Sequence, residues 1–343
     1  MPPIKSYLIA ASASLFILSG CDDSDNGPSR SEQIYTKAQQ SFPPLSATDS
    51  LDGTWIFIES GRIQSTEYFD HLDTTQTASG PSYSKTMVIV KEHADDTISL
   101  TSCKLDEEAP FQLDTDILTK TESRYTFTED KRDKDDALIE ASFIIADDHL
   151  SLTADISYTY DEKGDTRASS TIRGYKFSES TDFFENNLGT FTTSAFYHNN
   201  EAIINQQTDF TIGCIEYNEA DIMYSYEPES ENTPRSATGK LTGFSMLARS
   251  SDQDMLHLDL TQNNLKSSST RQGEPENNTS TYNEVTATYA LSPSDSYDFT
   301  YDQGNEEPEI FDYSIDSLTI SGEFSAGLPN DHNLSGSFTN VRY

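Results

Sequence analysis

Two groups of acidic residues, one of which contains a histidine, are the side chains in this sequence best suited to hold a metal ion. Carboxylate oxygens are the ligands that calcium prefers, and imidazole nitrogens bind transition metals. Neither group has the spacing of a defined metal site, and a chain with 58 acidic residues brings acids beside histidines by composition alone. We therefore expect solvated loops and no resident cofactor, with a divalent cation such as calcium as the alternative. The two groups are Asp70, His71 and Asp73, and Asp161, Glu162 and Asp165.

Motifs for catalysis are absent from the sequence. It contains no Gly-x-Ser-x-Gly, His-Glu-x-x-His or Cys-x-x-Cys motif and no glycine-rich phosphate loop. Residues 82–85 match Ser-x-x-Lys, the nucleophile motif of penicillin-recognising enzymes. That motif needs a helix to bring Ser and Lys together, and here it leads into an expected strand. We expect no enzymatic activity. A carboxylate-dependent envelope hydrolase stays as an alternative, although no acid pair can be singled out.

The first 20 residues are typical of an export signal. A positive charge at Lys5 precedes an apolar run of 12 residues from Tyr7 to Leu18, which is too short to cross a bilayer. The small residues Ser19 and Gly20 follow this run. Residues 1–20 are therefore predicted to be a signal peptide.

The string Leu18-Ser19-Gly20-Cys21 resembles the lipobox of bacterial lipoproteins. This resemblance implies cleavage before Cys21 and acylation of that residue, which would anchor the protein durably in a membrane. In enteric members of that family, an aspartate after the cysteine, here Asp22, keeps the protein at the inner membrane. We expect a lipid-anchored protein of the bacterial cell envelope, on the periplasmic face of the inner membrane, with the outer membrane as the alternative. An ordinary secretory signal is the competing interpretation.

Residues 21–50 are expected to form a flexible tether. The segment is rich in Ser, Asp and Gln and contains Pro43-Pro44, a composition that does not support a buried core. A short helix from Ser31 to Phe42 could lie within it, with Ser31 as its cap and Glu32 in its first turn.

The remaining cysteines, Cys103 and Cys214, form an even pair in a chain expected to be exported. Such pairs usually bridge in oxidising compartments. Both follow alternating segments and so lie on expected strands. We predict a disulfide that stabilises the fold by about 4 to 5 kcal/mol in the chain-entropy model. Two free buried thiols are the alternative.

Composition limits the partners of the chain. Its 58 acidic and 22 basic residues give a net charge of -36, which excludes binding to nucleic acid through a basic surface. A hydrophobic content of 34% excludes a protein with many membrane spans, and an aromatic content of 11% excludes a wholly disordered acidic tail. Loss of Lys5 with the signal changes the charge from -36 to -37. Self-repulsion at this density suggests a salt-tolerant source or routine occupancy by cations.

Alternation of apolar and polar residues dominates the chain after residue 50. In residues 150–160, Leu150, Leu152 and the following even positions are apolar or aromatic, whereas the odd positions are polar. Residues 256–261, 285–291 and 318–324 repeat this period, which places one face of each strand in a core. About fifteen such segments, with no convincing helix among them, predict an all-β fold built as an antiparallel sandwich or barrel.

The chain shows signs of two similar β-domains in tandem, over residues 51–185 and 186–343. Leu51-Asp52-Gly53-Thr54-Trp55 would open the first and Leu188-Gly189-Thr190-Phe191 the second. One continuous fold is the alternative. Gly53-x-Trp55 also resembles the opening of lipocalin-like barrels, which implies a Trp that closes the barrel floor. The competing interpretation is that Trp55 is a core aromatic of some other β-domain.

Three classes of function remain open. The first is a lipid-anchored, non-catalytic binding or interaction module that presents loops or a barrel mouth to an unknown envelope protein or ligand. The second is a structural or surface protein without a small ligand. The third is the hydrolase named above, which needs a site that the sequence does not reveal.

Overall fold

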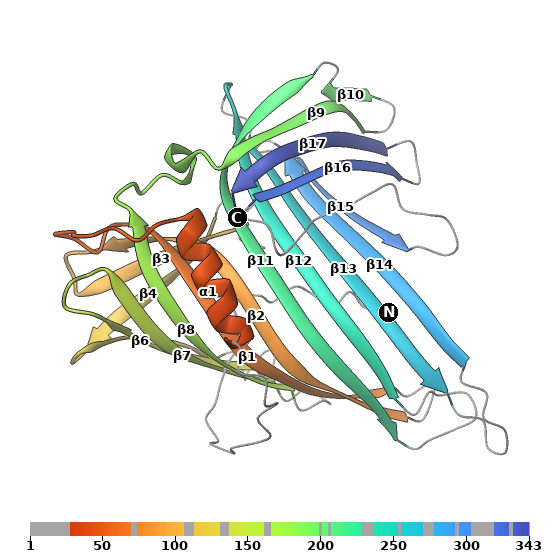
Figure 1. The fold of residues 1–343 in the computed structure, drawn as a ribbon, viewed down its shortest axis with the longest axis horizontal. Coiled ribbons are helices and arrows are strands. Elements are labelled where there is room, and N and C mark those ends of the chain that lie inside the picture. Colours follow the sequence, from red (N-terminus) through yellow and green to blue (C-terminus); the bar gives the residue numbers. More distant parts are fainter. Residues whose placement is uncertain are drawn as a thin grey trace.

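A computed structural model describes most of the chain after residue 27. The described ranges are 28–69, 74–105, 113–130, 137–160, 166–198, 201–204, 207–227, 236–252, 255–269, 278–291, 295–302, 319–328 and 332–342. Nearly all of these residues lie in antiparallel strands (Figure 1), which confirms the expected all-β class. No helix within these ranges is long and apolar enough to cross a membrane.

Eight strands of the first half close into a barrel. Each strand pairs with the next along the chain, and the eighth pairs back onto the first. The expected alternation is confirmed in the seventh strand, where Leu152, Ala154 and Ile156 are buried between exposed neighbours. The strands are β1 (Gly53–Phe69), β2 (Thr74–Glu92), β3 (Thr97–Leu105), β4 (Leu113–Thr121), β5 (Arg124–Asp130), β6 (Ala137–Ile145), β7 (Ser151–Tyr160) and β8 (Thr166–Ser178).

The second half repeats this order of pairing. A 3-10 helix, η1 (Phe183–Asn186), links the halves, and β10 (Glu201–Ile204) forms a short hairpin with β9 (Gly189–His198). Pairing runs from β16 through β17, β9, β11, β12, β13 and β14 to β15. Like β1, β9 pairs with both the next long strand and the last strand of its half. The other strands are β11 (Thr208–Glu227), β12 (Ser236–Ser250), β13 (Met255–Ser269), β14 (Asn278–Leu291), β15 (Asp295–Asp302), β16 (Thr319–Leu328) and β17 (His332–Arg342).

The glycines that begin the two halves have the same unusual backbone. Gly53 has φ of 150° and Gly189 has φ of 157°, values that a residue with a Cβ rarely adopts. A Cβ on Gly53 would lie 2.3 Å from the carbonyl oxygen of Ser178 on β8. At Gly189, it would lie 3.0 Å from Val341 on β17. In each half, therefore, the first strand approaches the last closely at a glycine.

Strands β2 and β11 join the halves into one sheet. Residues 89–92 of β2 pair with β3, whereas residues 75–86 pair with β11. A disulfide between Cys103 and Cys214 connects β3 to β11 beside this junction, with the two Cα atoms 5.7 Å apart. Both cysteines are fully buried, and the predicted pairing is confirmed.

Alternation along β1 separates two hydrophobic cores. Trp55 and Phe57 point into the first barrel, where they join aromatic and aliphatic residues from the other seven strands. Ile56 and Ile58 point outward into a second core shared with β11 and the N-terminal helix. The outer side of the first barrel is therefore buried where the second half and the helix cover it.

Helix α1 (Arg30–Ser41) packs on the outside of β1 and β2 (Figure 1). Its cap is Ser29, which accepts a hydrogen bond from the Glu32 amide at 3.3 Å, two residues before the cap expected at Ser31. Ile34 and Ala38 on the helix, and Phe42 just after it, are buried. Residues 30–50 thus depart from the tether expected over 21–50, because one helix face supplies apolar side chains to the second core.

Candidate functional site

The residues expected to bind a metal lie outside the described ranges. This holds for Asp70, His71 and Asp73 and for Asp161, Glu162 and Asp165, as it does for the lipidation residue Cys21. Among the described residues, no three His, Cys, Asp or Glu side chains gather as a metal site would require. Calcium binding at either group therefore stays a prediction.

Another acid beside a histidine is described, and it stabilises a turn. Asp95 accepts a hydrogen bond from Thr97 Oγ1 at 2.6 Å, which lowers the pKa of the Asp95 carboxyl. His93 Nε2 lies 3.0 Å from Ser99 Oγ. Asp96 adopts a positive φ of 60° in the same β2–β3 turn. These side chains therefore stabilise the β2–β3 turn, and their contacts are accounted for by that structural role.

A surface groove of about 600 Å³ lies between η1, the start of β11 and the end of β12. Asp209 and Thr211 point into it from β11, and the β11–β12 pairing places Arg249 directly opposite Thr211. The lining is rich in hydroxyl, amide and carboxylate groups. The lining residues are Phe184, Gln207, Thr208, Asp209, Thr211, Arg249, Ser250, Ser251 and Asp252.

A bulge in β11 lies next to this groove and contacts Phe184, one of the lining residues. The β11–β12 register shifts between Ile212 and Cys214, so Gly213 is the extra residue. A Cβ on Gly213 would lie 2.6 Å from the Phe184 ring, so only a glycine lets η1 approach this closely. The adjacent Cys214 is held to β3 by the disulfide, which fixes β11 at the bulge.

Phe184 in turn supports Arg249, the arginine among the described lining residues. The Arg249 guanidinium carbon lies 4.0 Å from the centroid of the Phe184 ring, a cation–π contact. Arg249 Nη2 also donates to Asp182 Oδ2 at 3.3 Å. An aromatic face and one carboxylate therefore hold the guanidinium in place. Within the described part of the chain, Nε and Nη1 of Arg249 have no hydrogen-bond partner, which leaves these donors for a ligand.

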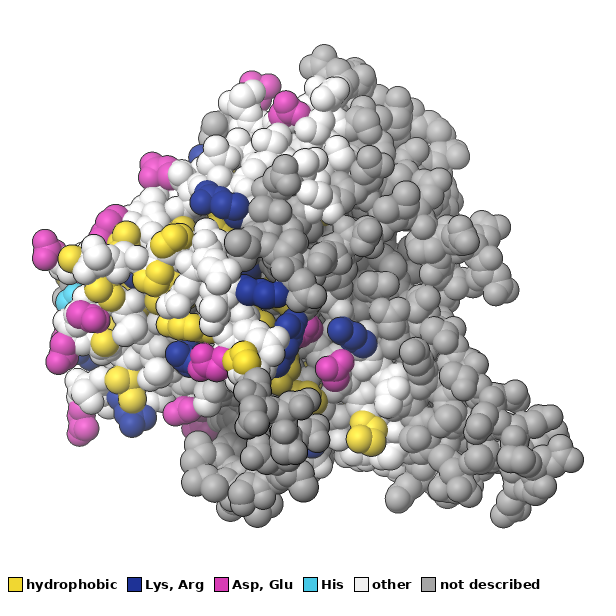
Figure 2. All heavy atoms as spheres, in the orientation of Figure 1, with side chains coloured by type: hydrophobic (Ala, Val, Ile, Leu, Met, Phe, Trp, Pro, Cys, Tyr) yellow, Lys and Arg dark blue, Asp and Glu magenta, His cyan; other side chains and the backbone are white. Residues whose placement is uncertain are grey.

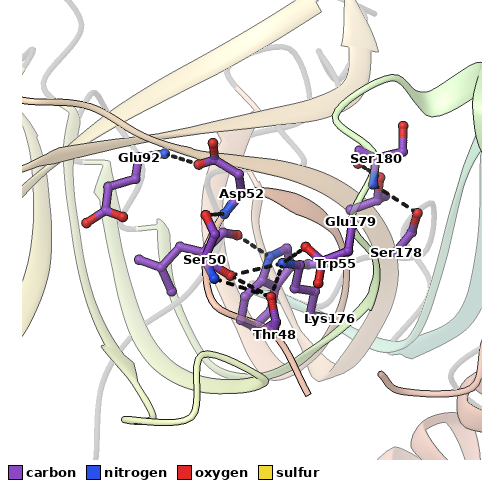
Figure 3. A network of polar contacts seen from close by, with 11 residues as sticks. Thr48, Ser50, Asp52, Trp55, Glu92, Lys176, Ser178, Glu179 and Ser180 are labelled. Carbon is purple, nitrogen blue, oxygen red and sulfur yellow. Dashed lines mark hydrogen bonds and ion pairs between the residues drawn. The ribbon is translucent and has the colours of Figure 1, made fainter. Parts of the chain in front are cut away.

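A second polar cluster closes one end of the first barrel and has a structural role (Figure 3). Lys176 on β8 is fully buried, and its Nζ donates to Thr48 Oγ1 at 2.7 Å and to the Ser50 carbonyl at 2.9 Å. It also donates to Glu179 Oε2 at 2.5 Å, and this bond lowers the pKa of the Glu179 carboxyl. Thr48, Ser50 and Glu179 accept the three hydrogen bonds of this ammonium, so the cluster stabilises the barrel end.

A third cluster of charges lies where α1 meets the sheet. On the face shown in Figure 2, several Lys and Arg side chains gather near the middle, where α1 lies in Figure 1. Arg173 on β8 binds Glu32, and its guanidinium carbon lies 4.1 Å from the Tyr35 ring centroid. Arg30 Nε donates to Glu219 Oε1 at 2.5 Å. These ion pairs fasten α1 to both halves.

Lys85, on β2 beneath α1, has a pKa well below the ordinary value for a lysine. Its side chain is buried, with Nζ 5.7 Å from the centroid of the Phe42 ring. Burial lowers the pKa of Lys85 to about 7, because the low-dielectric surroundings penalise the charged form. Lys85 belongs to the Ser-x-x-Lys string, and the strand places Ser82 and Lys85 on opposite faces of β2. This geometry is incompatible with the nucleophile motif.

One acid of the first barrel is also perturbed. Burial raises the pKa of Asp116 on β4 to about 7, and the charges of Asp114 and Glu129 act in the same direction. These side chains share the alternating face of β4 and β5 that carries the buried Leu118 and Tyr125. The inward faces of β4 and β5 therefore carry acidic side chains next to their buried apolar ones.

Comparisons with known proteins identify no family for this chain. No protein-family model matches it, and no curated protein matches it. Among solved structures, kievitone hydratase from Nectria haematococca aligns over 88% of this chain and 94% of its own, at 9% identity and a TM-score of 0.14. At that similarity the match supports no conclusion about fold or function.

Proposed function

We propose that this protein is a lipid-anchored protein of the bacterial cell envelope that acts as a non-catalytic binding module. The lipobox-like string ending at Cys21 supports the anchor, and the groove beside Arg249 supports the binding role. The groove is the observation that carries the proposal. It places an oriented guanidinium with available donors among carboxylates and hydroxyls. Apart from Phe184, the lining residues do not belong to either hydrophobic core.

A rigid scaffold surrounds this groove. The disulfide, the bulge at Gly213 and the pairing of β11 with both β9 and β12 fix its walls. Binding sites positioned in this way lose little conformational entropy when a ligand arrives. In a purely structural protein, the Arg249 donors would face solvent without a role.

Native mass spectrometry of the mature chain tests the proposal. The protein is purified from its own envelope in mild detergent, with its acyl groups retained. We expect a mass that matches residues 21–343 plus acyl chains, together with a specific adduct that is lost on partial denaturation. An unacylated mass would contradict the anchor. An acylated chain without an adduct would favour the structural role and would contradict binding of a small ligand.

A Cys21→Ser variant gives the matched control for the anchor. Without the thiol, acylation at this residue is blocked, and we expect the protein to leave the membrane fraction. If the variant stays in membranes as the parent does, the lipid anchor is refuted. The folded body is not altered by this change, so adduct formation should persist.

A further inference from the structure

We infer that the groove between η1, β11 and β12 binds a neutral glycan, that is, a short run of sugar rings without formal charge. The inference rests on the proposed binding function and assigns it a ligand class. It follows from the charges that line the groove, from the hydrogen-bonding groups between them, and from the pairing of the strands beneath.

Charge in the groove disfavours ions of either sign. Asp209 and Asp252 line the same groove as Arg249, and Asp182 already binds the guanidinium. An anionic ligand would therefore meet more carboxylates than cations, in a chain whose net charge is -36. A metal ion would in turn meet the fixed guanidinium. The lining fits a ligand without net charge.

The remaining groups fit hydroxyls better than apolar surface. The groove presents carboxylate acceptors at Asp209 and Asp252, donors at Arg249, and side chains that both donate and accept. Thr192 Oγ1 donates to Asp209 Oδ1 at 2.8 Å, which holds that carboxylate in place. Sugar hydroxyls need such mixed partners, and hydrogen bonds with a charged partner are the stronger ones. The volume of about 600 Å³ lies within the range of ordinary ligand pockets.

Two features argue against other neutral ligands. The Arg249 guanidinium covers one face of the half-buried Phe184 ring, which reduces the apolar surface that the ring offers to a ligand. An extended peptide would bind by adding a strand to a free sheet edge. Here residues 208–212 of β11 pair with β9, and residues 210–212 also pair with β12, so residues 210–212 lack a free edge. A glycan recognised through side chains fits both observations.

Saturation-transfer NMR on the mature chain tests the inference. The probes are maltotriose, cellotriose, laminaritriose and chitotriose, with trigalacturonate as the acidic probe and dialanine as the peptide probe. We expect at least one neutral trisaccharide to bind more tightly than both other classes. The inference is overturned if no neutral trisaccharide binds at millimolar concentration, or if trigalacturonate or dialanine binds more tightly.

Two variants locate the binding. Arg249→Met removes the oriented donors, and Asp252→Asn keeps the shape while removing one carboxylate. Each should weaken the neutral trisaccharide by about tenfold, the effect of losing one charge-assisted hydrogen bond. Arg124→Met, which changes an exposed arginine on β5, is the matched control and should leave affinity unchanged.

The variants also separate this inference from the proposed function. Saccharide binding that survives both groove variants would overturn the assignment of the groove while leaving a binding role intact. A native-mass adduct of some other chemical class that is lost in Arg249→Met would keep the groove as a binding site and refute the glycan. Circular dichroism confirms that each variant is folded before affinity is compared.

Discussion

Trp55 on β1 and Lys176 on β8 are cross-strand partners, and both are fully buried at the same end of the first barrel. Trp55 Nε1 donates to the Leu51 carbonyl at 3.1 Å, while Lys176 Nζ binds the segment around Ser50 (Figure 3). A Cβ on Gly53 would lie 2.5 Å from Lys176 Cε, so the glycine makes room for the lysine stem. Gly53 thus leaves room for Lys176 on the last strand of the barrel, and Trp55 and Lys176 both bind the segment that precedes β1.

Replacing this cation should destabilise the protein without affecting the groove. Lys176→Met would remove the ammonium that ties Thr48 Oγ1 and the Ser50 carbonyl to β8, and only Thr48 Oγ1 would still donate to that carbonyl. We expect a loss of about 2 kcal/mol in the free energy of unfolding, the usual contribution of hydrogen bonds made by a charged group. Urea titration followed by tryptophan fluorescence measures it, because Trp55 is the only tryptophan. Lys240→Met, at an exposed position of β12, is the matched control. Equal stability of the two variants would refute the structural role of Lys176.

Removing the disulfide should loosen the junction between the halves. Cys103→Ala combined with Cys214→Ala opens a covalent loop with a sequence separation of 111 residues. The chain-entropy model gives a loss of about 4 to 5 kcal/mol for a loop of that size. Differential scanning calorimetry of the double variant and the parent provides the comparison. If reduction of the parent leaves its melting temperature unchanged, the bridge does not contribute as expected.

The strands could be predicted from the sequence because alternation is a local pattern. The disulfide could be predicted because few cysteines are available to pair. Alternation in residues 150–160 needs only neighbouring positions. Once Cys21 is assigned to the lipobox, the two remaining cysteines allow only one pairing. Closure of the barrel depends on pairing β1 with β8, more than 100 residues away in sequence, which alternation does not encode. The choice between sandwich and barrel therefore had to come from the structure.

The candidate site was missed for a related reason. Arg249 and Asp182 belong to no motif, and they meet only because Gly213 forms a bulge that admits Phe184. An isolated glycine within a strand pattern is the one sequence signal that pointed to such a bulge. The packing of α1 was also missed, since the polar residues around Pro43-Pro44 masked the short apolar face that ends at Phe42.

Salt should raise the melting temperature. Screening weakens the mutual repulsion of the carboxylates that give the net charge of -36. Sodium chloride added from low to molar concentration should therefore stabilise the fold progressively. Thermal melts followed by far-ultraviolet circular dichroism measure this effect. Choline chloride gives the control for specific sodium binding. A melting temperature independent of salt would refute self-repulsion as a major term.

Stability should also increase with pH through the titration of Lys85. Its folded pKa of about 7 lies below the ordinary value of 10.5, so between these values the unfolded chain binds a proton that the folded chain does not. The free energy of unfolding then rises with pH by about 1.4 kcal/mol per unit, and the penalty of burying the charge is fully present below pH of about 7. Lys85→Met should remove this slope. Urea titrations at several pH values above neutrality measure it, with Lys240→Met keeping the slope of the parent. Parallel pH profiles for Lys85→Met and the parent would show that the titration of Lys85 does not contribute to the pH dependence of stability.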